Sequence, residues 1–320
     1  MRIFLRWAVA TLVITALVPI ALLLKYGKYQ KALPEDEETV SVYVAQEDKV
    51  LEMNKNQYLK EVVSAEMPVS FEMEALKAQA VAARSYLVSR QNAYKISGTP
   101  ENHKGADICT DPTHCKAWIS EEKRRESWGN DADKNWDKIS RAVEETKGEV
   151  ITYNGEVISA VFHSTSSGKT ENSKDVWGGE RPYLVSVDSY GDTLSPKYKS
   201  EKEMSLKEFE KIAKENIEGV DFSNGIVGNI ARSDAGGILT VEIGGVSVKG
   251  TVFRKLYDLR STNVEIIIDK DNVKFDVTGF GHGVGMSQYG ANYLASQGKG
   301  YKEILKAYYT GVEIEKEEEE

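Results

Sequence analysis

The longest apolar run of the sequence lies near its start, from Trp7 to Leu24, where two threonines are the only polar side chains. At about 1.5 Å per helical residue, a run of this length is close to the minimum that spans a bilayer core of about 30 Å. The segment that follows, KYGKYQKALPEDEE, does not resemble a signal-peptide cleavage site. Residues 1–34 therefore predict a cytoplasmic tail, an uncleaved transmembrane anchor and a linker, with the folded part outside the cytoplasm.

After this segment the apolar positions first recur at every second residue and then at every third or fourth residue. Residues 38–53 alternate between polar and apolar side chains around the turn QEDK, which predicts two antiparallel strands. Steps of three and four residues follow, and predict a short helix ending near Ala65 and a long helix from about Phe71 to Gln91. Pro68 must separate them, and Ser70 is the predicted N-cap of the second helix. The predicted buried stripe of that helix is Met73, Leu76, Ala80, Ala83 and Leu87.

The rest of the chain mixes both periods. A helix, a strand, a hairpin turn at Asn154-Gly155 and a second strand ending at His163 come first. An amphipathic helix at SLKEFEKIAKENI precedes short alternating segments from Gly225 to Val277, and SQYGANYLASQG predicts a final helix ended by Gly298. The predicted class is α+β, with helices and antiparallel strands together. The predicted units are the anchor and linker at 1–34, a main region at 35–314, within it a smaller strand-rich lobe at approximately 195–275, and an acidic tail at 315–320.

Length, net charge and cysteine count limit the classes of fold and function that the chain can have. The chain has 320 residues, 41% hydrophobic and 28% charged, which allows one large core or two smaller ones. Its formal net charge of -9 argues against a nucleic-acid partner, because such a partner requires basic surfaces that displace counterions. Two cysteines are too few for a disulfide scaffold.

Both cysteines and two of the four histidines lie in one loop, as His103, Cys109, His114 and Cys115. A disulfide would close a loop of about seven residues and stabilise by roughly 2.4 kcal/mol. A four-ligand zinc site would contribute on the order of 10 kcal/mol. Export favours the disulfide, whereas the clustered histidines favour zinc, so the residues alone leave zinc, a disulfide and free thiols open.

Glu66 is the carboxylate with the most unusual surroundings in the sequence. It lies at a predicted helix C-terminus, next to Val62, Val63 and Met67, and both features disfavour its charged form. A raised pKa suits a general acid. Position alone does not identify a catalyst among 50 acidic residues.

The segment GFGHGVGMSQYGANYL carries the other candidate site residues. It matches neither dinucleotide nor phosphate-loop spacing, so its glycines instead predict close backbone approach, with His282 presented from the loop. Tyr289, Asn292 and Tyr293 share one helix face, which suits a sugar but also ordinary packing. His163 precedes a Ser/Thr loop, yet the nucleophile-elbow motif of serine hydrolases and the H-E-x-x-H motif of zinc peptidases are absent from the sequence.

Taken together, four segments resemble the SpoIID/LytB family of cell-wall proteins. They are YLKEVVSAEMPVSFEMEALKAQAVAARSY, VFHSTSSGKTENSKDVWGGERPYLVSVDS, LRSTNVEI and GFGHGVGMSQYGANYLASQGKGYKEILKAYYTGVEI, and the resemblance covers nearly all of residues 40–314. It implies a lytic transglycosylase that cleaves peptide-free glycan strands of peptidoglycan between N-acetylmuramic acid and N-acetylglucosamine, leaving 1,6-anhydromuramyl ends. The alternative is a non-catalytic glycan-binding protein or amidase activator.

The resemblance also implies roles for single residues. It makes Glu66 the catalytic residue, and some relatives hold zinc in the region of His103, Cys109, His114 and Cys115. Substrate binding is expected at Lys77, Arg84, His163, Ser164, Ser167, His282, Gln288, Tyr289, Asn292 and Tyr293. The implied setting is engulfment in endospore formation, in the space between mother cell and forespore, with stage II sporulation proteins P and M as partners. The oligomeric state is open, a homodimer included.

Overall fold

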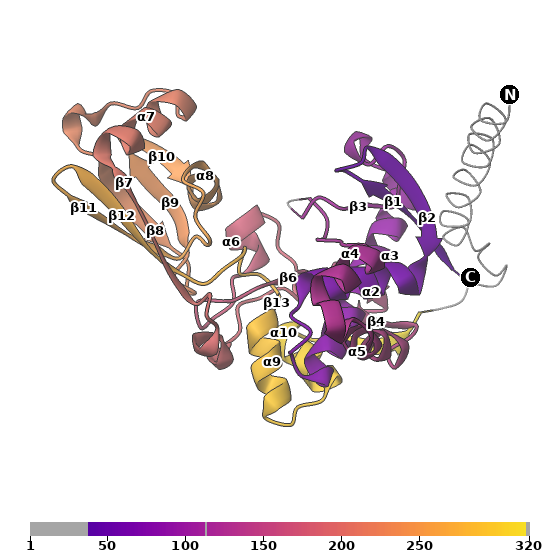
Figure 1. Ribbon diagram of the computed structural model, residues 1–320. Helices are drawn as coiled ribbons and strands as arrows, with labels where there is room; N and C mark the ends of the chain where they lie inside the picture. The colour runs from indigo at the N-terminus through magenta and orange to yellow at the C-terminus, as the bar shows by residue number, and fades with distance from the viewer. Residues whose placement is uncertain (1–37, 113, 318–320) are drawn as a thin grey trace, which may run out of the picture.

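The computed structural model describes residues 38–112 and 114–317, so the predicted anchor at Trp7–Leu24 lies outside the described residues. Within those ranges, no helix combines the length and the apolar character that crossing a membrane requires. The described chain forms two lobes, each with its own apolar core (Figure 1). Mixed helices and antiparallel strands confirm the α+β class.

The first lobe begins with the predicted strand pair. β1 (Thr39–Val44) and β2 (Lys49–Asn54) are antiparallel, and β3 (Ile108–Cys109) extends the sheet by pairing in parallel with β1. Asn54 accepts a hydrogen bond from the Gln57 N–H and so caps α2 (Lys55–Glu66), which ends as predicted before Pro68.

The long central helix, α3 (Met73–Ser97), differs from its prediction in three respects. Its N-cap is Glu72 and not Ser70, because a turn in which the Phe71 N–H donates to the Pro68 carbonyl delays the helix start. It continues past Gln91 and ends at Gly98, whose φ of 75° no helix can use. It is buried on all sides from Ala75 to Val88, because α2, α5 (Ala132–Glu144), α9 (Gln288–Ser296) and α10 (Tyr301–Tyr308) surround it.

The predicted hairpin at Asn154-Gly155 is confirmed, and both residues have positive φ. β4 (Glu149–Tyr153) pairs with β5 (Glu156–Val157) across it. The second strand does not continue to His163, because the Ala160 N–H donates to the Ile158 carbonyl and turns the chain away. β6 (Phe162–His163) then pairs in parallel with β13 (Met286–Ser287). On its other side β4 pairs with β14 (Glu313–Lys316), so the predicted acidic tail begins inside a strand.

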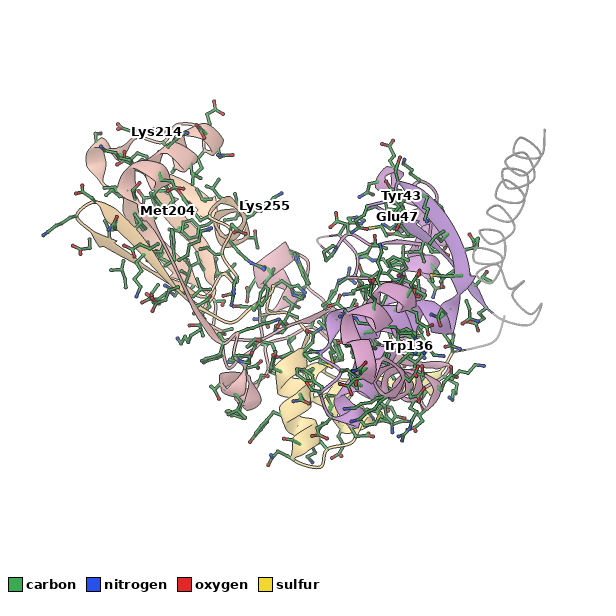
Figure 2. The ribbon with its side chains drawn as sticks, viewed as in Figure 1. Tyr43, Glu47, Trp136, Met204, Lys214 and Lys255 are labelled. Atoms are coloured by element: carbon green, nitrogen blue, oxygen red, sulfur yellow. The ribbon has the colours of Figure 1, made fainter. Side chains whose placement is uncertain are left out.

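The second lobe holds a core of aromatic side chains between short sheets and helices. The Phe209 and Tyr257 rings stack 4.6 Å apart, and Phe253 and Phe275 complete the group. The sequence predicted the helix α7 and strands between Gly225 and Val277, but neither the strand β7 nor the helix α8. Its elements are β7 (Lys199–Ser205), α7 (Leu206–Asn216), β8 (Val227–Arg232), β9 (Ile238–Ile243), β10 (Val246–Lys249), α8 (Gly250–Leu256), β11 (Val264–Asp269) and β12 (Asn272–Thr278). In Figure 2, Met204 marks this lobe and Trp136 the other.

The lobes meet where the glycine loop joins β12 to β13. Gly279, Gly281, Gly283 and Gly285 all have positive φ. A Cβ on Gly285 would lie 2.2 Å from the Val161 carbonyl oxygen, and one on Gly281 would lie 2.7 Å from the His163 Cβ. The predicted close backbone approach is therefore confirmed, and it fixes His163 beside the loop. α6 (Ser173–Trp177) lies between the two lobes in Figure 1.

Candidate active site

Glu66 is the last residue of α2, and its carboxyl group faces two other segments. Oε1 accepts a hydrogen bond from the Ala117 backbone N–H at 2.9 Å, and Oε2 accepts one from the Gln288 Nε2 at 3.4 Å. The side chain is half-buried, so a ligand can reach it from solvent. Segments 51 and 222 residues away in sequence thus converge on one carboxyl group.

Opposing effects act on the pKa of Glu66. Burial raises the pKa, while Lys116, the Ala117 N–H and Gln288 stabilise the carboxylate and hold the pKa back. Lys116 is itself buried, with its Nζ 3.8 Å from the centre of the Phe162 ring and 4.0 Å from that of Tyr86. Burial lowers the pKa of Lys116 to about 8, against the charge of Glu66. Such surroundings let one carboxyl group hold a proton and also exist as a carboxylate.

Gln288 connects Glu66 to the fully buried Gln79 of α3. The Gln288 Nε2 also lies 3.5 Å from the Gln79 Oε1, so both acceptors face the same amide nitrogen. That arrangement fixes which end of the Gln288 side chain meets Glu66. The sequence singled out Gln288 but missed Gln79 and Lys116.

A second carboxyl group of α2, Glu61, anchors the segment that supplies the Ala117 N–H. Glu61 accepts hydrogen bonds from Trp118 Nε1 at 2.8 Å, the Glu121 N–H at 2.9 Å and Gln57 Nε2 at 3.1 Å. Burial raises the pKa of Glu61 to about 6. Because its oxygens are engaged inside the protein, Glu61 positions the segment and Glu66 is the carboxyl group left for chemistry.

The two histidines near the glycine loop are neutral and differ in tautomer. His163 Nδ1 lies 3.1 Å from the Val284 carbonyl oxygen, which only accepts, so Nδ1 carries the proton. Its Nε2 is then a buried acceptor, and it has no partner among the described residues. His282 Nδ1 instead accepts the Val284 N–H. Burial lowers the pKa of His163 to about 4 and that of His282 well below its usual value.

The Ser/Thr loop after His163 is organised by Asp192, which the sequence did not reveal. This fully buried carboxylate accepts the Ser166 N–H at 3.0 Å, the hydroxyls of Ser166 at 2.7 Å and Ser189 at 2.5 Å, and the Ser287 hydroxyl. Ser287 caps α9, immediately before Gln288. Asp192 therefore supports the helix start that presents Gln288 to Glu66.

Two serines predicted to bind substrate make contacts within the protein. The Ser167 hydroxyl donates to the Ala235 carbonyl of the second lobe at 3.0 Å. The Ser164 carbonyl accepts the Tyr289 N–H, and its hydroxyl lies 3.4 Å from that of Thr165.

The predicted face of α9 packs against neighbouring segments. The Tyr289 ring meets Phe71 edge-on at 4.9 Å, and the Asn292 Oδ1 accepts the Glu72 N–H at 2.8 Å. Tyr293 packs so closely that a Cβ on Gly191 would lie 2.0 Å from its own Cβ. This face positions the start of α3 near the site.

Lys77 and Arg84 are used inside the protein. Arg84 is 1% exposed and donates to three carbonyls, those of Val143 in the last turn of α5, Thr146 after its end and Glu149 at the start of β4. Lys77 pairs with Glu74 and Glu145, each at 2.8 Å. At about 100° per helical residue, both point well away from the direction of Gln79, and so from Glu66. Their predicted contact with substrate has no support in this geometry.

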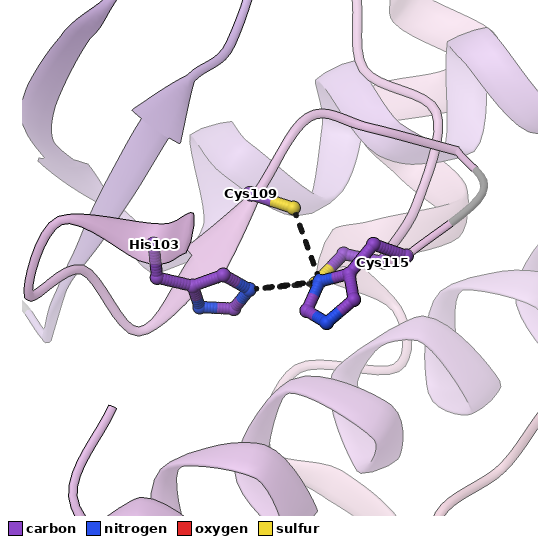
Figure 3. A group of neighbouring side chains, drawn as sticks. His103, Cys109 and Cys115 are labelled. Carbon is purple, nitrogen blue, oxygen red and sulfur yellow. Dashed lines mark hydrogen bonds between the residues drawn. The ribbon is translucent and has the colours of Figure 1, made fainter. Parts of the chain in front are cut away.

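The four predicted metal ligands come together beside Glu66. His103, Cys109 and Cys115 converge in Figure 3, and the ligand atoms of these three and His114 lie within 4.8 Å of one another. Cys115 Sγ lies 3.3 Å from His103 Nε2 and 3.4 Å from His114 Nδ1. Both cysteines are free. The four side chains could hold a metal ion.

Hydrogen bonds prepare this cluster for a cation. His103 Nδ1 lies 3.2 Å from the Ala106 carbonyl oxygen, which fixes its proton there and turns the lone pair of Nε2 toward the sulfurs. A hydrogen bond between the two thiols lowers the pKa of Cys115 and raises that of Cys109, so Cys115 is the first of the two to become the thiolate that binds metals. Lys116 and Ala117 follow Cys115 directly, so the metal cluster and the Glu66 contacts belong to one segment.

Comparison with known sequences identifies the family of this chain. The sequence model of the family described as Stage II sporulation protein matches residues 43–153, which include Glu66 and the cysteine loop. The chain is 37% identical to stage II sporulation protein D of Bacillus amyloliquefaciens over 286 residues, covering 89% of this chain and 81% of the relative. It is 36% identical to that of Bacillus subtilis (strain 168), covering 86% and 78%.

A third relative is the amidase enhancer of Bacillus subtilis (strain 168), 31% identical over 80% of this chain but 40% of its own length. The family model defines a sporulation protein as the class. The chain belongs to the stage II sporulation protein D family, which confirms the resemblance drawn from the sequence.

Proposed function

We propose that this protein is a membrane-anchored lytic transglycosylase of peptidoglycan. Its substrate would be peptide-free glycan strands, cut between N-acetylmuramic acid and N-acetylglucosamine during engulfment. The family membership supports a role in sporulation, and the surroundings of Glu66 support the chemistry.

In the proposed reaction Glu66 acts twice. Its protonated carboxyl group donates a proton to the glycosidic oxygen while the bond from that oxygen to the muramyl anomeric carbon breaks. The muramyl 6-hydroxyl oxygen bonds to the same carbon, and its proton passes to the Glu66 carboxylate. The ring closes as a 1,6-anhydro sugar, and Glu66 ends in its starting state. The Lys116 charge and the Ala117 N–H would stabilise the intervening carboxylate.

One observation carries this proposal. Among the described residues, the charge that shifts the pKa of Glu66 is that of Lys116, and no acidic side chain contributes. A glycoside hydrolase places two carboxyl groups about 5–9.5 Å apart across the bond, the second as nucleophile or base. The neighbouring Glu61 is engaged by Trp118 and Glu121. A single available carboxyl group fits a reaction whose nucleophile is the substrate's own hydroxyl.

Product analysis tests the reaction. The full-length protein in detergent is incubated with glycan strands stripped of their peptides, and the fragments are weighed by mass spectrometry. Anhydromuramyl ends, lighter than hydrolysed ends by one water, are the expected product. Reducing muramyl ends would instead identify a hydrolase and overturn the proposal.

A second candidate function is a non-catalytic glycan-binding protein that activates an amidase. The likeness to a protein named amidase enhancer favours it. It predicts that the protein binds glycan and accelerates a partner amidase while releasing no glycan fragments. The same product analysis separates the two functions.

We propose zinc as the metal of the cluster and a structural role for it. Zn–N bonds of about 2.0 Å and Zn–S bonds of about 2.3 Å set tetrahedral ligand separations of about 3.3–3.8 Å. The nitrogen-sulfur separations of 3.3, 3.4 and 3.5 Å fit this geometry. With His103, Cys109, His114 and Cys115 as ligands, four protein atoms would leave no position for a reactive water. The ion would supply a crosslink of the loop.

The cellular setting remains part of this proposal. We place the folded part outside the cytoplasm, in the space between mother cell and forespore, held by the anchor at Trp7–Leu24. Stage II sporulation proteins P and M are the proposed partners, and protein P would prepare the peptide-free strands. Co-purification of the full-length protein with each partner from sporulating cells tests this arrangement.

A further inference from the structure

A cavity of about 260 Å³ lies between α6 of the first lobe and the β9, β10 and α8 elements of the second. Its wall carries the Trp177 side chain, which is 50% exposed although it is the largest apolar group of α6. On the opposite side Gly237 allows Glu171 and Thr262 to approach the backbone closely, since a Cβ there would lie 2.3 Å from the Glu171 Oε1 and 2.8 Å from the Thr262 Oγ1. An indole held half-exposed over an open cavity is a surface on which a ligand can stack.

The polar lining of the cavity carries charges of both signs. Lys174 and Lys249 line it, and no ion pair of the described residues involves either ammonium group. The two acids of the lining accept hydrogen bonds within the protein, Asp175 from Asn172 at 2.7 Å and Glu171 from the Gly237 N–H at 3.2 Å. Three threonine hydroxyls add donors and acceptors without charge, from Thr240, Thr251 and Thr262. The lining therefore suits a ligand with hydroxyl groups, and the two lysines are the charged groups of the lining that can meet a carboxylate.

A row of rings connects this cavity to the proposed reaction site. The Trp177 ring lies 5.1 Å from that of His282, which lies 5.7 Å from that of His163. At the other end of this row, Lys116 Nζ lies 3.8 Å from the centre of the Phe162 ring, which precedes His163, and the next residue, Ala117, donates to Glu66. The contacts from Glu66 to Trp177 thus form one continuous series, along which a glycan strand would extend.

We propose that this cavity, which we call the Trp177 subsite, binds one muramyl residue of the glycan strand through its sugar face and its free lactyl carboxylate. The proposal rests on the proposed function, because it takes the strand cut at Glu66 as the ligand. The cavity is smaller than the roughly 300–1,000 Å³ typical of drug-sized ligands, which suits a single sugar unit. The C–H face of that sugar stacks on Trp177, and its carboxylate lies between Lys174 and Lys249.

The subsite would also explain a preference for strands without peptides. A stem peptide is attached through an amide at the lactyl group, so the attachment removes the charge that the two lysines would bind. Selection against peptide-bearing strands would then come from the subsite and not from Glu66.

Binding measurements test the subsite apart from the reaction. Titration calorimetry on the full-length Glu66→Gln protein in detergent would compare two probes. One is a peptide-free tetrasaccharide of alternating N-acetylglucosamine and N-acetylmuramic acid, and the other is chitotetraose, which has no carboxylate. Trp177→Ala is expected to lower affinity for both probes about tenfold, the loss of a ring contact. Lys174→Met combined with Lys249→Met is expected to lower affinity about fivefold for the muramyl probe and to leave that for chitotetraose unchanged.

Controls keep the outcomes decisive. Lys255→Met removes a lysine of the same helix region that does not line the cavity, and it should bind both probes as the parent does. Trp177→Phe keeps an aromatic face and should retain most of the affinity even if Trp177→Ala unfolds. Unchanged affinity in Trp177→Ala, or equal losses for both probes in the double lysine variant, would overturn the subsite. Absence of anhydromuramyl products from the wild type, with these binding losses intact, would instead overturn the proposed function alone.

Discussion

The segment from Cys115 to Ala117 joins two polar clusters with opposite properties. On one side, His103, Cys109, His114 and Cys115 turn their ligand atoms toward one another. On the other side, the half-buried Glu66 accepts one hydrogen bond on each carboxyl oxygen, from Ala117 on Oε1 and from Gln288 on Oε2. The nitrogen and sulfur atoms of the His/Cys cluster contact one another, whereas the half-buried carboxyl group of Glu66 can also contact a ligand. The proposed role of the His/Cys cluster is therefore structural, and the proposed reaction takes place at Glu66.

The largest effect that we expect is the loss of reaction rate on substitution of Glu66. Glu66→Gln keeps the size of the side chain and removes the proton transfer, so the rate of anhydromuramyl formation should fall by about 10²- to 10⁴-fold. The melting temperature should not fall, because burying a charged carboxylate costs more free energy than burying a neutral amide. Glu61→Gln is the matched control on the same helix and should change stability more than rate. A Glu66→Gln protein with wild-type rate would show that another group supplies the proton.

The next largest effect that we expect is the loss of stability on substitution of either cysteine of the His/Cys cluster. Cys109→Ser or Cys115→Ser should lower the free energy of unfolding by more than about 4 kcal/mol, the range that loss of a metal site produces. Activity should fall only in proportion to the unfolded fraction, measured by thermal denaturation next to the rate assay. Metal analysis should find one zinc per wild-type chain. A variant that stays fully folded but inactive would make the metal catalytic.

The sequence predicted this pair of clusters better than it predicted their surroundings. Pro68 and the change of apolar spacing located α2 and α3, and the four candidate metal ligands were predictable because all lie within one short loop. Lys116 and Gln79 were not, because their burial depends on β6 and α9, which come from distant parts of the chain. The resemblance assigned Lys77 and Arg84 to substrate binding, but the sequence could not show that the end of α5 lies against their face of α3.

A buried carboxylate was equally hidden in the sequence. Asp192 follows Gly191 in a segment typical of solvent-exposed turns, and only the folding of Ser166 and Ser287 around it removes it from water. Short helices such as α8 escape detection for a related reason. Their apolar positions are too few to define a period, and burial of Phe253 in the second core decides their structure.

The third effect tests whether the Glu66 side depends on this distant carboxylate. Asp192→Asn leaves several buried donors with fewer acceptors, which should cost about 3 kcal/mol of the free energy of unfolding. Because Ser287 starts α9, the remaining folded protein should also react more slowly as Gln288 loses its position. Asp188→Asn, an exposed carboxylate of the same segment, is the control. A destabilised Asp192→Asn protein whose folded fraction reacts at the wild-type rate would limit Asp192 to stability.

The smallest effect that we expect is a change in the pH dependence of the rate on substitution of Lys116. The proposed reaction starts from protonated Glu66, so the rate should fall as the pH rises through the pKa of that group, which burial raises. Lys116 is the charge that holds this pKa back, so Lys116→Met should raise it further and move the alkaline limb of the rate profile to higher pH. The expected displacement is below about one pH unit, because one unit already corresponds to about 1.4 kcal/mol. Methionine fits between the Phe162 and Tyr86 rings, so the fold should be retained. An alkaline limb at the same pH in the folded Lys116→Met protein would show that the Lys116 charge does not act on the reacting group.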